Sequence, residues 1–427
     1  MEPGPTPSYC AVMNRRIVLA AGLAVAVGLS GAAAIAWRPA IAGIAPPPRT
    51  AFRPDAIERG ATLAAIGDCS VCHTAGGGRP YAGGRALPTP FGTIHVTNIT
   101  PDPGTGIGQW PEAAFRRAMR DGIDREGRHL YPALPYPHFT RATDADIGAL
   151  YAFLMTREPV RATVPANRLP FPLDVRATVA GWNLLFLRPG AWTPDLAQTP
   201  EWNRGAYLAE AVGHCGACHT PHNVLGAERD SQALGGGVAE GWSGHPLQDG
   251  SPAARPWTVD ELAEYLATGL SAQHGAAAGP MLAVTRELSR VPAADVRALA
   301  VYVASQTPRA VPQAALREAA AEDPLFTGAC AACHAEASPM TRGGAPPLAL
   351  STTVNAPTPR NAIRVVLHGI SPREDAPAPA MPGFGAALSD GQVADLVRFV
   401  RARYSSRPPW TDTEADVRAA RAEETDP

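Results

Sequence analysis

The sequence predicts an all-α protein in which three tandem domains follow an N-terminal membrane helix. Three observations lead to this prediction. A unit made of a helix, a C-x-x-C-H motif, a long loop and a second helix occurs three times along the chain. The loops between the helices hold many of the 41 glycines and 45 prolines, which interrupt regular structure. An uncharged apolar run, residues 17–37, directly follows two arginines.

The repeated units divide the 427-residue chain into segments, and a chain of this length suits several domains. The predicted segments are a cytoplasmic stub with the signal-anchor helix (1–45), domain 1 (50–160), a linker (161–195), domain 2 (196–306), domain 3 (318–406) and a C-terminal tail (407–427).

The first helices of the first two units are closely similar. Residues 59–74 read RGATLAAIGDCSVCHT, and residues 204–220 read RGAYLAEAVGHCGACHT, with one residue inserted in the second copy. Leu and Ala recur at helical spacing in both. The second helices begin near Thr143, Pro292 and Ser389, and in each an Asp or Gln stands three residues further on. This spacing resembles the capping box of a helix start.

The apolar run at 17–37 is long enough for a membrane helix. A bilayer core requires about 20 apolar residues, whereas the core of a cleaved signal peptide has about 7–15. Length therefore favours a retained anchor, although the Ala-rich end of the run resembles a cleavage site. Arg15 and Arg16 would hold the N-terminus in the cytoplasm. The remainder is then expected on the periplasmic side of the bacterial inner membrane.

Charge excludes one class of partner. The chain has 37 basic and 39 acidic side chains and a net charge of −2. It therefore offers no electrostatic basis for binding nucleic acid.

Six of the seven cysteines form the three motifs, and Cys10 stands apart from them. C-x-x-C-H is the attachment sequence of c-type haem. The two thiols, on one helical turn, bond the porphyrin, and the adjacent histidine binds the iron. The predicted covalent attachment residues are Cys69, Cys72, Cys215, Cys218, Cys330 and Cys333, and the predicted proximal iron ligands are His73, His219 and His334.

Other uses of these cysteines fit less well. A structural zinc site needs four ligands, usually from two neighbouring pairs, and these pairs are far apart in sequence. A redox C-x-x-C does not require the following histidine or three copies. The motifs therefore predict three covalently bound c-type haems.

With these motifs the chain resembles the triheme cytochrome c subunits of membrane-bound periplasmic dehydrogenases. Further segments carry the likeness: TPFGTIHVTNITPDPGTGIG (89–108), HGAAAGPM (274–281), APAMPGFG (378–385) and LSDGQ (388–392). The resemblance spans residues 55–405. It implies three small all-helical class I cytochrome c domains. It also implies a subunit that passes electrons from a dehydrogenase to membrane ubiquinone or an oxidase, and is not itself the substrate-oxidising enzyme.

Methionine is a common sixth ligand of such a haem. Met281 and Met381 lie in Pro/Gly-rich loops before the closing helices of the second and third units, and the chain has only seven methionines. We predict both as iron ligands. Pro90, Trp242 and Pro347 occupy loops expected to pack against the haems or to accept the N–H of the proximal histidine.

The first unit departs from this pattern. The loop GRHLYPALPYPHFTR (127–141) has Leu134 where related cytochromes have methionine, and leucine cannot bind iron. His138 is the tentative sixth ligand of the first haem. His129 and an open, five-coordinate iron remain alternatives. Met119 and Met155 are disfavoured because both lie in predicted helices.

The predicted function is electron transfer from a large catalytic subunit to ubiquinone or a terminal oxidase chain. A quinoprotein or flavoprotein dehydrogenase is the partner that the family implies. The Leu134 departure and the long N-terminal run favour instead a molybdenum hydroxylase that acts on aldehydes or N-heterocycles. The alternative is a multihaem enzyme of the peroxidase type, using an open first haem.

Overall fold

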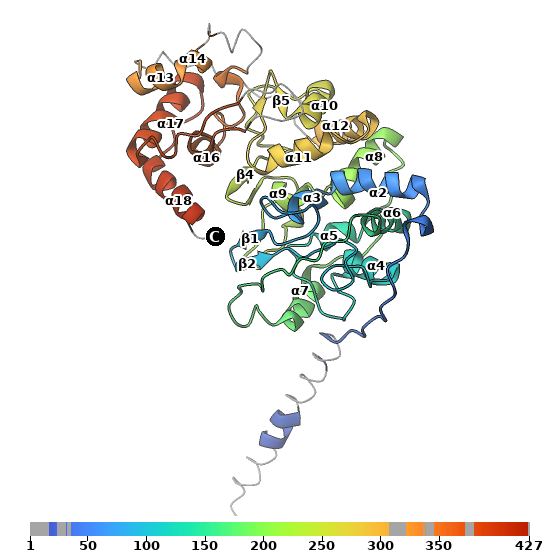
Figure 1. Ribbon diagram of the computed structural model, residues 1–427. Helices are drawn as coiled ribbons and strands as arrows, with labels where there is room; N and C mark the ends of the chain where they lie inside the picture. Colours follow the sequence, from blue (N-terminus) through green and yellow to red (C-terminus); the bar gives the residue numbers. More distant parts are fainter. Residues whose placement is uncertain are drawn as a thin grey trace, which may run out of the picture.

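The computed structural model describes residues 17–23, 31, 36–306, 322–335, 338, 346–371 and 380–425 (Figure 1). Cys10 and the predicted cytoplasmic stub lie outside these ranges, as does the segment 307–321 between the second and third units.

Domain 1 begins after a short extended segment. Its elements are η1 (Arg49–Ala51), α2 (Pro54–Ile66), α3 (Cys69–Cys72), β1 (Ala86–Thr89), β2 (Gly92–His95), α4 (Glu112–Asp121), α5 (Tyr136–Phe139) and α6 (Asp144–Met155). The following segment contains η2 (Arg176–Thr178) and α7 (Val179–Phe186).

Domain 2 repeats this order with additional short elements. They are α8 (Pro200–Tyr207), the π-helical turn η3 (Leu208–Val212), α9 (Gly216–His219), η4 (Asp230–Gln232), β3 (Gly237–Ala239), β4 (Trp242–Gly244), α10 (Val259–Thr268), β5 (Leu270–Ser271), β6 (Gly275–Ala276), α11 (Pro280–Leu288) and α12 (Ala293–Gln306).

Domain 3 contributes α13 (Pro324–Ala329), α14 (Ala331–His334), η5 (Leu348–Leu350), α16 (Arg360–His368), α17 (Asp390–Tyr404) and α18 (Thr413–Thr425). Helix α18 lies within the segment predicted as a tail. It packs against α16 and α17, and Trp410, Val417 and Ala420 are buried there (Figure 1).

A pair of crossing helices forms the frame of each of the first two domains. Helix α2 crosses α6, and α8 crosses α12. The crossing requires glycine, because a Cβ on Gly60 would lie 2.0 Å from the Ala149 carbonyl oxygen and one on Gly205 would lie 1.9 Å from that of Ala298. The arginine before each glycine pairs with an aspartate of the crossing helix: Arg59 with Asp146 at 3.0 Å and Arg204 with Asp295 at 2.8 Å.

The all-α prediction is wrong, because the described chain contains three two-stranded antiparallel sheets: β1–β2, β3–β4 and β5–β6. The first two hairpins follow the first two C-x-x-C-H motifs, in segments that the sequence presents only as Pro/Gly loops. In the first hairpin Thr89 pairs with Gly92, where a positive φ of 120° suits glycine. Each of these two hairpins is therefore part of the site formed by the C-x-x-C-H motif that precedes it.

The predicted N-terminal membrane helix is not supported. Of residues 17–37 the structure describes 17–23, 31, 36 and 37. Within the described ranges no helix is both long and apolar enough to cross a membrane. The retained inner-membrane anchor, which was predicted from the apolar run, is therefore corrected.

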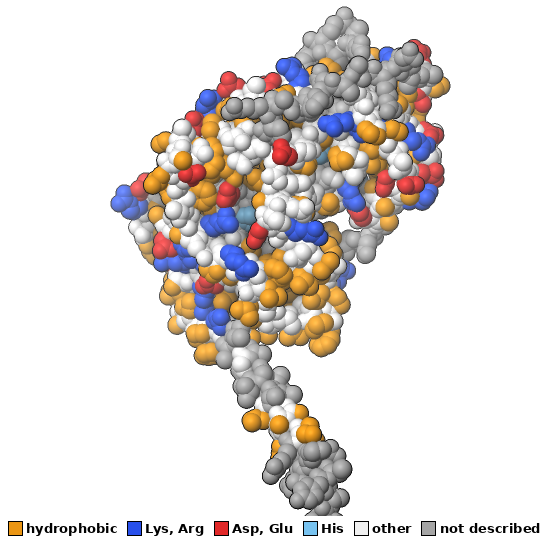
Figure 2. Space-filling view, turned by 180° about the vertical axis from the view of Figure 1, so that it is seen from behind, with side chains coloured by type: hydrophobic (Ala, Val, Ile, Leu, Met, Phe, Trp, Pro, Cys, Tyr) orange, Lys and Arg blue, Asp and Glu red, His pale blue; other side chains and the backbone are white. Residues whose placement is uncertain are grey.

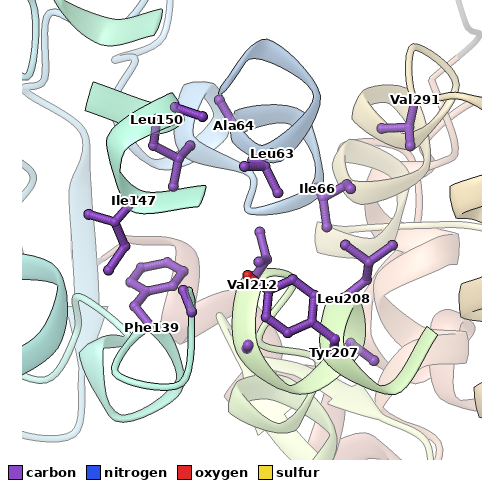
Figure 3. Packing of buried hydrophobic residues seen from close by; sticks show 14 of the residues in the cluster. Leu63, Ala64, Ile66, Phe139, Ile147, Leu150, Tyr207, Leu208, Val212 and Val291 are labelled. Carbon is purple, nitrogen blue, oxygen red and sulfur yellow. The ribbon is translucent and has the colours of Figure 1, made fainter. Parts of the chain in front are cut away.

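Domains 1 and 2 share one hydrophobic core. Leu63, Ile66 and Ile147 of domain 1 belong to the same buried cluster as Leu208 and Val212 of domain 2 (Figure 3). Tyr207 also joins the domains, because its hydroxyl donates to Asp146 Oδ2 at 2.6 Å. The two domains are therefore packed as a unit. Basic and acidic side chains are interspersed over the face in Figure 2, in keeping with the net charge of −2.

Candidate haem sites

The first C-x-x-C-H motif occupies a tight turn. Asp68 precedes it in the left-handed conformation, with φ at 50°, and Cys69 and Cys72 lie on the single turn of α3. His73 ends this turn, and its Nδ1 donates to the Thr97 carbonyl oxygen at 2.7 Å. Because a carbonyl can only accept, this bond leaves Nε2 as the nitrogen available to a metal. Burial lowers the pKa of His73 to about 4, so the ring is neutral, as an iron ligand must be.

The second motif has the same construction. His214 precedes it at a φ of 38°, and His219 Nδ1 donates to the His245 carbonyl oxygen at 2.7 Å. The β3–β4 hairpin packs against the motif so closely that a Cβ on Gly244 would lie 2.3 Å from the Cys218 carbonyl oxygen. In both domains the segment after a hairpin thus fixes the tautomer of the predicted ligand.

The residues that accept the N–H of the proximal histidines are not the ones that the sequence predicted. Thr97 and His245 accept from the proximal histidines, rather than Pro90 or Trp242. Pro90 instead lies between the two strands of the first hairpin and lines the cavity at His73. The Trp242 ring covers Gly279, where a Cβ would lie 2.4 Å from it. No sequence signal identifies these acceptors, because any residue supplies a carbonyl.

The motif cysteines of the described chain are not paired in disulfides. Within the described residues all six are free. Burial raises the pKa of Cys69, Cys215 and Cys218 to about 12 and that of Cys72 to about 11, so the thiols stay protonated. No group of three or more His, Cys, Asp or Glu side chains that could hold a metal ion occurs in the described part of the chain.

A cavity of about 2430 Å³ extends from the first motif to the second, where Cys218 and His245 line it, and on to Arg364 of domain 3. It is several times larger than a typical small-molecule pocket of about 300–1,000 Å³. Cys69, Cys72 and His73 line it together with apolar side chains, among them Ile107, Phe115, Leu130, Leu150 and Leu154. Two thiols, an imidazole with a free Nε2 and apolar walls are what a covalently bound haem requires, so the site fits this group.

The third motif is described in part. Cys330 is buried, Cys333 is exposed, and both lie at α14 with His334, whose pKa is lowered by burial. Met381 forms an isolated antiparallel bridge with Ile370: the Met381 N–H donates to Ile370 O at 3.0 Å, and the Ile370 N–H donates back at 2.8 Å. Pro347 directly precedes η5. Residues 372–379, between the two bridge partners, are outside the described ranges.

Met281, the other predicted methionine ligand, lies in the first turn of α11 and is half-buried. Gly279 precedes this helix at a φ of 54°, a conformation that favours glycine. The main chain is therefore turned sharply just before Met281, against the ring of Trp242.

The loop 127–141 places both Leu134 and His138 on the cavity that His73 lines, but the ring nitrogens of His138 are engaged by other residues. His138 Nδ1 donates to the Glu210 carbonyl oxygen at 2.8 Å, and Nε2 donates to Glu228 Oε1 at 2.6 Å. Both partners belong to domain 2. Neither ring nitrogen is free to bind iron in this structure.

The other candidate ligands of the first haem are His129, Met155 and Met119, and they lie in different surroundings. His129 is buried, bonds the Ala36 carbonyl oxygen at 2.9 Å through Nε2 and is not among the residues lining the cavity. Met155 is buried in the shared core. Met119, on α4, is buried and does line the cavity, because α4 turns the same face inward as Phe115 and Ala118. Its position on a predicted helix concealed this from sequence reasoning.

The fold and these sites define a class of protein: a c-type cytochrome, in which thioether bonds hold haem to the chain. Comparisons with known proteins agree. The family model for cytochrome c matches residues 57–158, and that for subunit III of cbb3-type cytochrome c oxidase matches residues 317–400.

Curated relatives identify the family more closely. The fructose dehydrogenase cytochrome subunit of Gluconobacter japonicus is 33% identical over 88% of this chain and 85% of its own length. The alcohol dehydrogenase (quinone) cytochrome c subunit of Gluconacetobacter polyoxogenes is 36% identical over 84% of this chain and 83% of its own. The chain therefore belongs to the family of cytochrome c subunits of dehydrogenases. Its members are electron-transfer subunits and not catalytic ones.

A third relative, one of the subunits of nicotinate dehydrogenase from Pseudomonas putida, is much longer. It is 46% identical over 92% of this chain, and the chain spans about a third of that relative's length (34%).

Proposed function

We propose that this chain is a triheme electron-transfer subunit that takes electrons from a partner dehydrogenase and passes them to ubiquinone or a terminal oxidase chain. Covalently held haem supplies one-electron exchange between ferric and ferrous iron. The chain's own residues attach it, orient its proximal ligand and exclude water. The proposal assigns one haem to each of the three C-x-x-C-H motifs.

The contact between the first two motifs carries this proposal. His214 Nε2 donates to the Gly67 carbonyl oxygen at 3.2 Å, and Gly67 and His214 each lie within two residues of the first cysteine of their motif. A Cβ on Gly67 would lie 3.2 Å from the Val212 carbonyl oxygen. Arg85 also bridges the two hairpins, with 2.6 Å to Glu240. The attachment sites are thus held close together by a shared core, which suits rapid transfer between them.

Domain 3 connects to the second site. Asn361 Oδ1 accepts from the Ser243 N–H at 2.8 Å, and Asn361 Nδ2 donates to the Ser243 carbonyl at 2.9 Å. Ser243 is two residues before His245, whose carbonyl fixes His219. A sequence of sites from domain 1 through domain 2 to domain 3 is therefore supported by direct contacts.

We infer that the partner is of the kind that oxidises N-heterocycles, such as the molybdenum hydroxylases. Identity is higher with the nicotinate dehydrogenase subunit (46%) than with the fructose (33%) and alcohol (36%) dehydrogenase subunits. Affinity purification of the chain from its host should recover a large hydroxylase subunit. Adding nicotinate or a related heterocycle to that complex should reduce the haems, and ubiquinone should reoxidise them. Recovery of a quinoprotein or flavoprotein instead would contradict the assignment.

Met281 and Met381 are the proposed sixth ligands of the second and third haems. Replacing either by alanine should lower the reduction potential of one haem, because a thioether ligand favours the ferrous state. The haem content should stay the same. A redox titration in which neither variant shifts a potential would contradict these assignments.

For the first haem we propose an iron without a sixth protein ligand from the loop 127–141. Leu134 lines the cavity there, and both nitrogens of His138 are bonded to domain 2. The multihaem enzyme alternative is not adopted, because the relatives are electron-transfer subunits.

A further inference from the structure

The residue inserted in the second repeat creates a π-helical turn, η3, which contacts the loop 127–141 of domain 1, called the lid loop below. In η3 the Gly213 N–H reaches back to the Leu208 carbonyl oxygen at 2.7 Å, and the Cys215 N–H reaches the Ala209 carbonyl oxygen at 3.0 Å. The Glu210 carbonyl oxygen accepts from His138 Nδ1. Single π-helical turns are rare and often occur at functional sites.

His138 is a cation in this arrangement. Its Nδ1 faces a carbonyl oxygen and its Nε2 faces a carboxylate oxygen, at 2.8 and 2.6 Å, and both partners are acceptors. Both ring nitrogens therefore donate, which requires the doubly protonated imidazolium. Burial pushes the pKa of Glu228 upward, but the His138 hydrogen bond and the nearby histidines outweigh this effect and leave the pKa below its usual value. The two side chains form a charged pair that is largely buried.

This pair lies directly against the second haem-attachment motif. A Cβ on Gly216, the residue after Cys215, would lie 2.8 Å from Glu228 Oε2 and 3.0 Å from His138 Cε1. The first motif has Ser70 in the corresponding place. A side chain at position 216 would therefore displace the pair of His138 and Glu228, which fills that space.

Neighbouring contacts hold the pair in place. The Glu210 carboxylate accepts from Arg141 at 2.9 Å and from the Tyr302 hydroxyl at 2.5 Å. The Phe139 ring packs edge-on against His214 at 5.6 Å between centroids. The lid loop of the first site is thus fixed to domain 2 at His138 and at Phe139 and Arg141, which follow it.

We propose that His138 and Glu228 are positioning residues of the second haem site, through which the first domain sets the reduction potential of the second haem. The inference rests on the proposed function. A carboxylate near a haem stabilises the ferric iron, whereas an imidazolium stabilises the ferrous iron, and low solvent exposure strengthens both effects. The pair balances these two charges beside the second haem, and His138 serves this site rather than the iron of the first.

Two charge-removing variants test the proposal by spectroelectrochemical titration of the full chain with its haems attached. Glu228→Gln should raise the second haem's potential, because the imidazolium is left without its counter-charge. His138→Gln should lower it, because the carboxylate is then uncompensated. The spin state of the first haem should change in neither variant. Glu158→Gln, in an exposed ion pair with Arg79, is the control and should shift no potential.

A second pair of variants uses the difference between the motifs. Gly216→Ser should displace the charged pair and shift the second potential, whereas Ser70→Gly should leave that potential unchanged. Shifts of the same sign in Glu228→Gln and His138→Gln, or none, would overturn the proposal. So would a change in the first haem's spin state on replacing His138. Haem content, measured on each variant, separates the two claims: a parent chain that lacks the first or the third haem contradicts the proposed function and not this inference.

Discussion

Asp68 is a buried carboxyl group between the first two haem sites. Its Oδ1 has no hydrogen-bond partner in the described part of the chain. Burial, with a smaller contribution from the charge of Glu287, raises its pKa to about 7. In the unfolded chain the pKa is about 3.9. Between these values the folded state retains a proton that the unfolded state has lost, so stability decreases as pH rises through this window.

Asp68→Asn should remove this pH dependence. Asparagine tolerates the left-handed φ of 50° and stays neutral. We expect the variant and the parent chain to have equal free energies of unfolding near pH 4. Near pH 8 we expect the variant to be more stable by about 2 kcal/mol. Urea unfolding across this pH range measures the difference, and parallel pH profiles for the two proteins would contradict the account of Asp68.

Leu134 stands in the loop of the first site, where the loops of the other two sites have Met281 and Met381 as predicted ligands. With no thioether in the loop and His138 bonded to domain 2, the reduced parent chain should bind carbon monoxide at one haem. Leu134→Met should abolish this binding, because the methionine supplies a sixth ligand. Absorption spectra of the reduced protein with and without carbon monoxide measure the effect.

Met119 is the control for this prediction, because it lines the same cavity. If the parent chain fails to bind carbon monoxide and Met119→Leu binds it, then Met119 is the sixth ligand and the open site is wrong. Met155→Leu, in the shared core, should behave like the parent chain in either case.

At the scale of elements, the helix crossings depend on two glycines. Gly60→Ala and Gly205→Ala should each destabilise the fold by more than about 3 kcal/mol, since the new Cβ meets a backbone carbonyl that cannot move alone. Gly328→Ala is the matched control. Nothing lies within 4 Å of its Cβ position in α13, so this change should stabilise by about 0.5–1 kcal/mol. Thermal unfolding that ranks the three variants alike would contradict this.

The predicted helices follow from the sequence because their apolar period and start residues are local signals. The capping prediction holds fully at α17, where Ser389 and Gln392 bond reciprocally. At α6 only one of the two capping hydrogen bonds forms. The Thr143 side chain accepts from the Asp146 N–H, but the Asp146 carboxylate accepts from Arg59 and Tyr207 instead of reaching back to the helix start. The local sequence at a helix start does not reveal when a residue from elsewhere in the fold hydrogen-bonds the capping side chain.

The short hairpins and the π-helical turn were not predicted. The hairpins are followed by the carbonyl oxygens of Thr97 and His245 that accept from the proximal histidines, and any residue type supplies a carbonyl. The inserted residue of the second repeat was visible in the sequence, but its consequence depends on the contact between Glu210 and His138, in different domains. For the same reason the position of His138 in its loop suggested a ligand, whereas the structure bonds it to domain 2.

At the scale of the whole molecule, direct contacts link the three domains that carry the C-x-x-C-H motifs. Domains 1 and 2 share a hydrophobic core, and domain 3 contacts the second hairpin through Asn361. Its C-terminal helix α18 is part of domain 3's core and not a free tail, since Arg421 bonds Asp390 at 2.8 Å and the carbonyls of Gly385 and Leu388.

Coulometric reduction of the full chain tests the central claim most directly, because it counts the electrons that each polypeptide accepts. We predict three electrons per chain, taken up and released reversibly. Replacing both cysteines of any one motif by alanine should reduce the count to two. Two or fewer electrons in the parent chain, or a count that one of these double variants leaves unchanged, would contradict the triheme electron-transfer function.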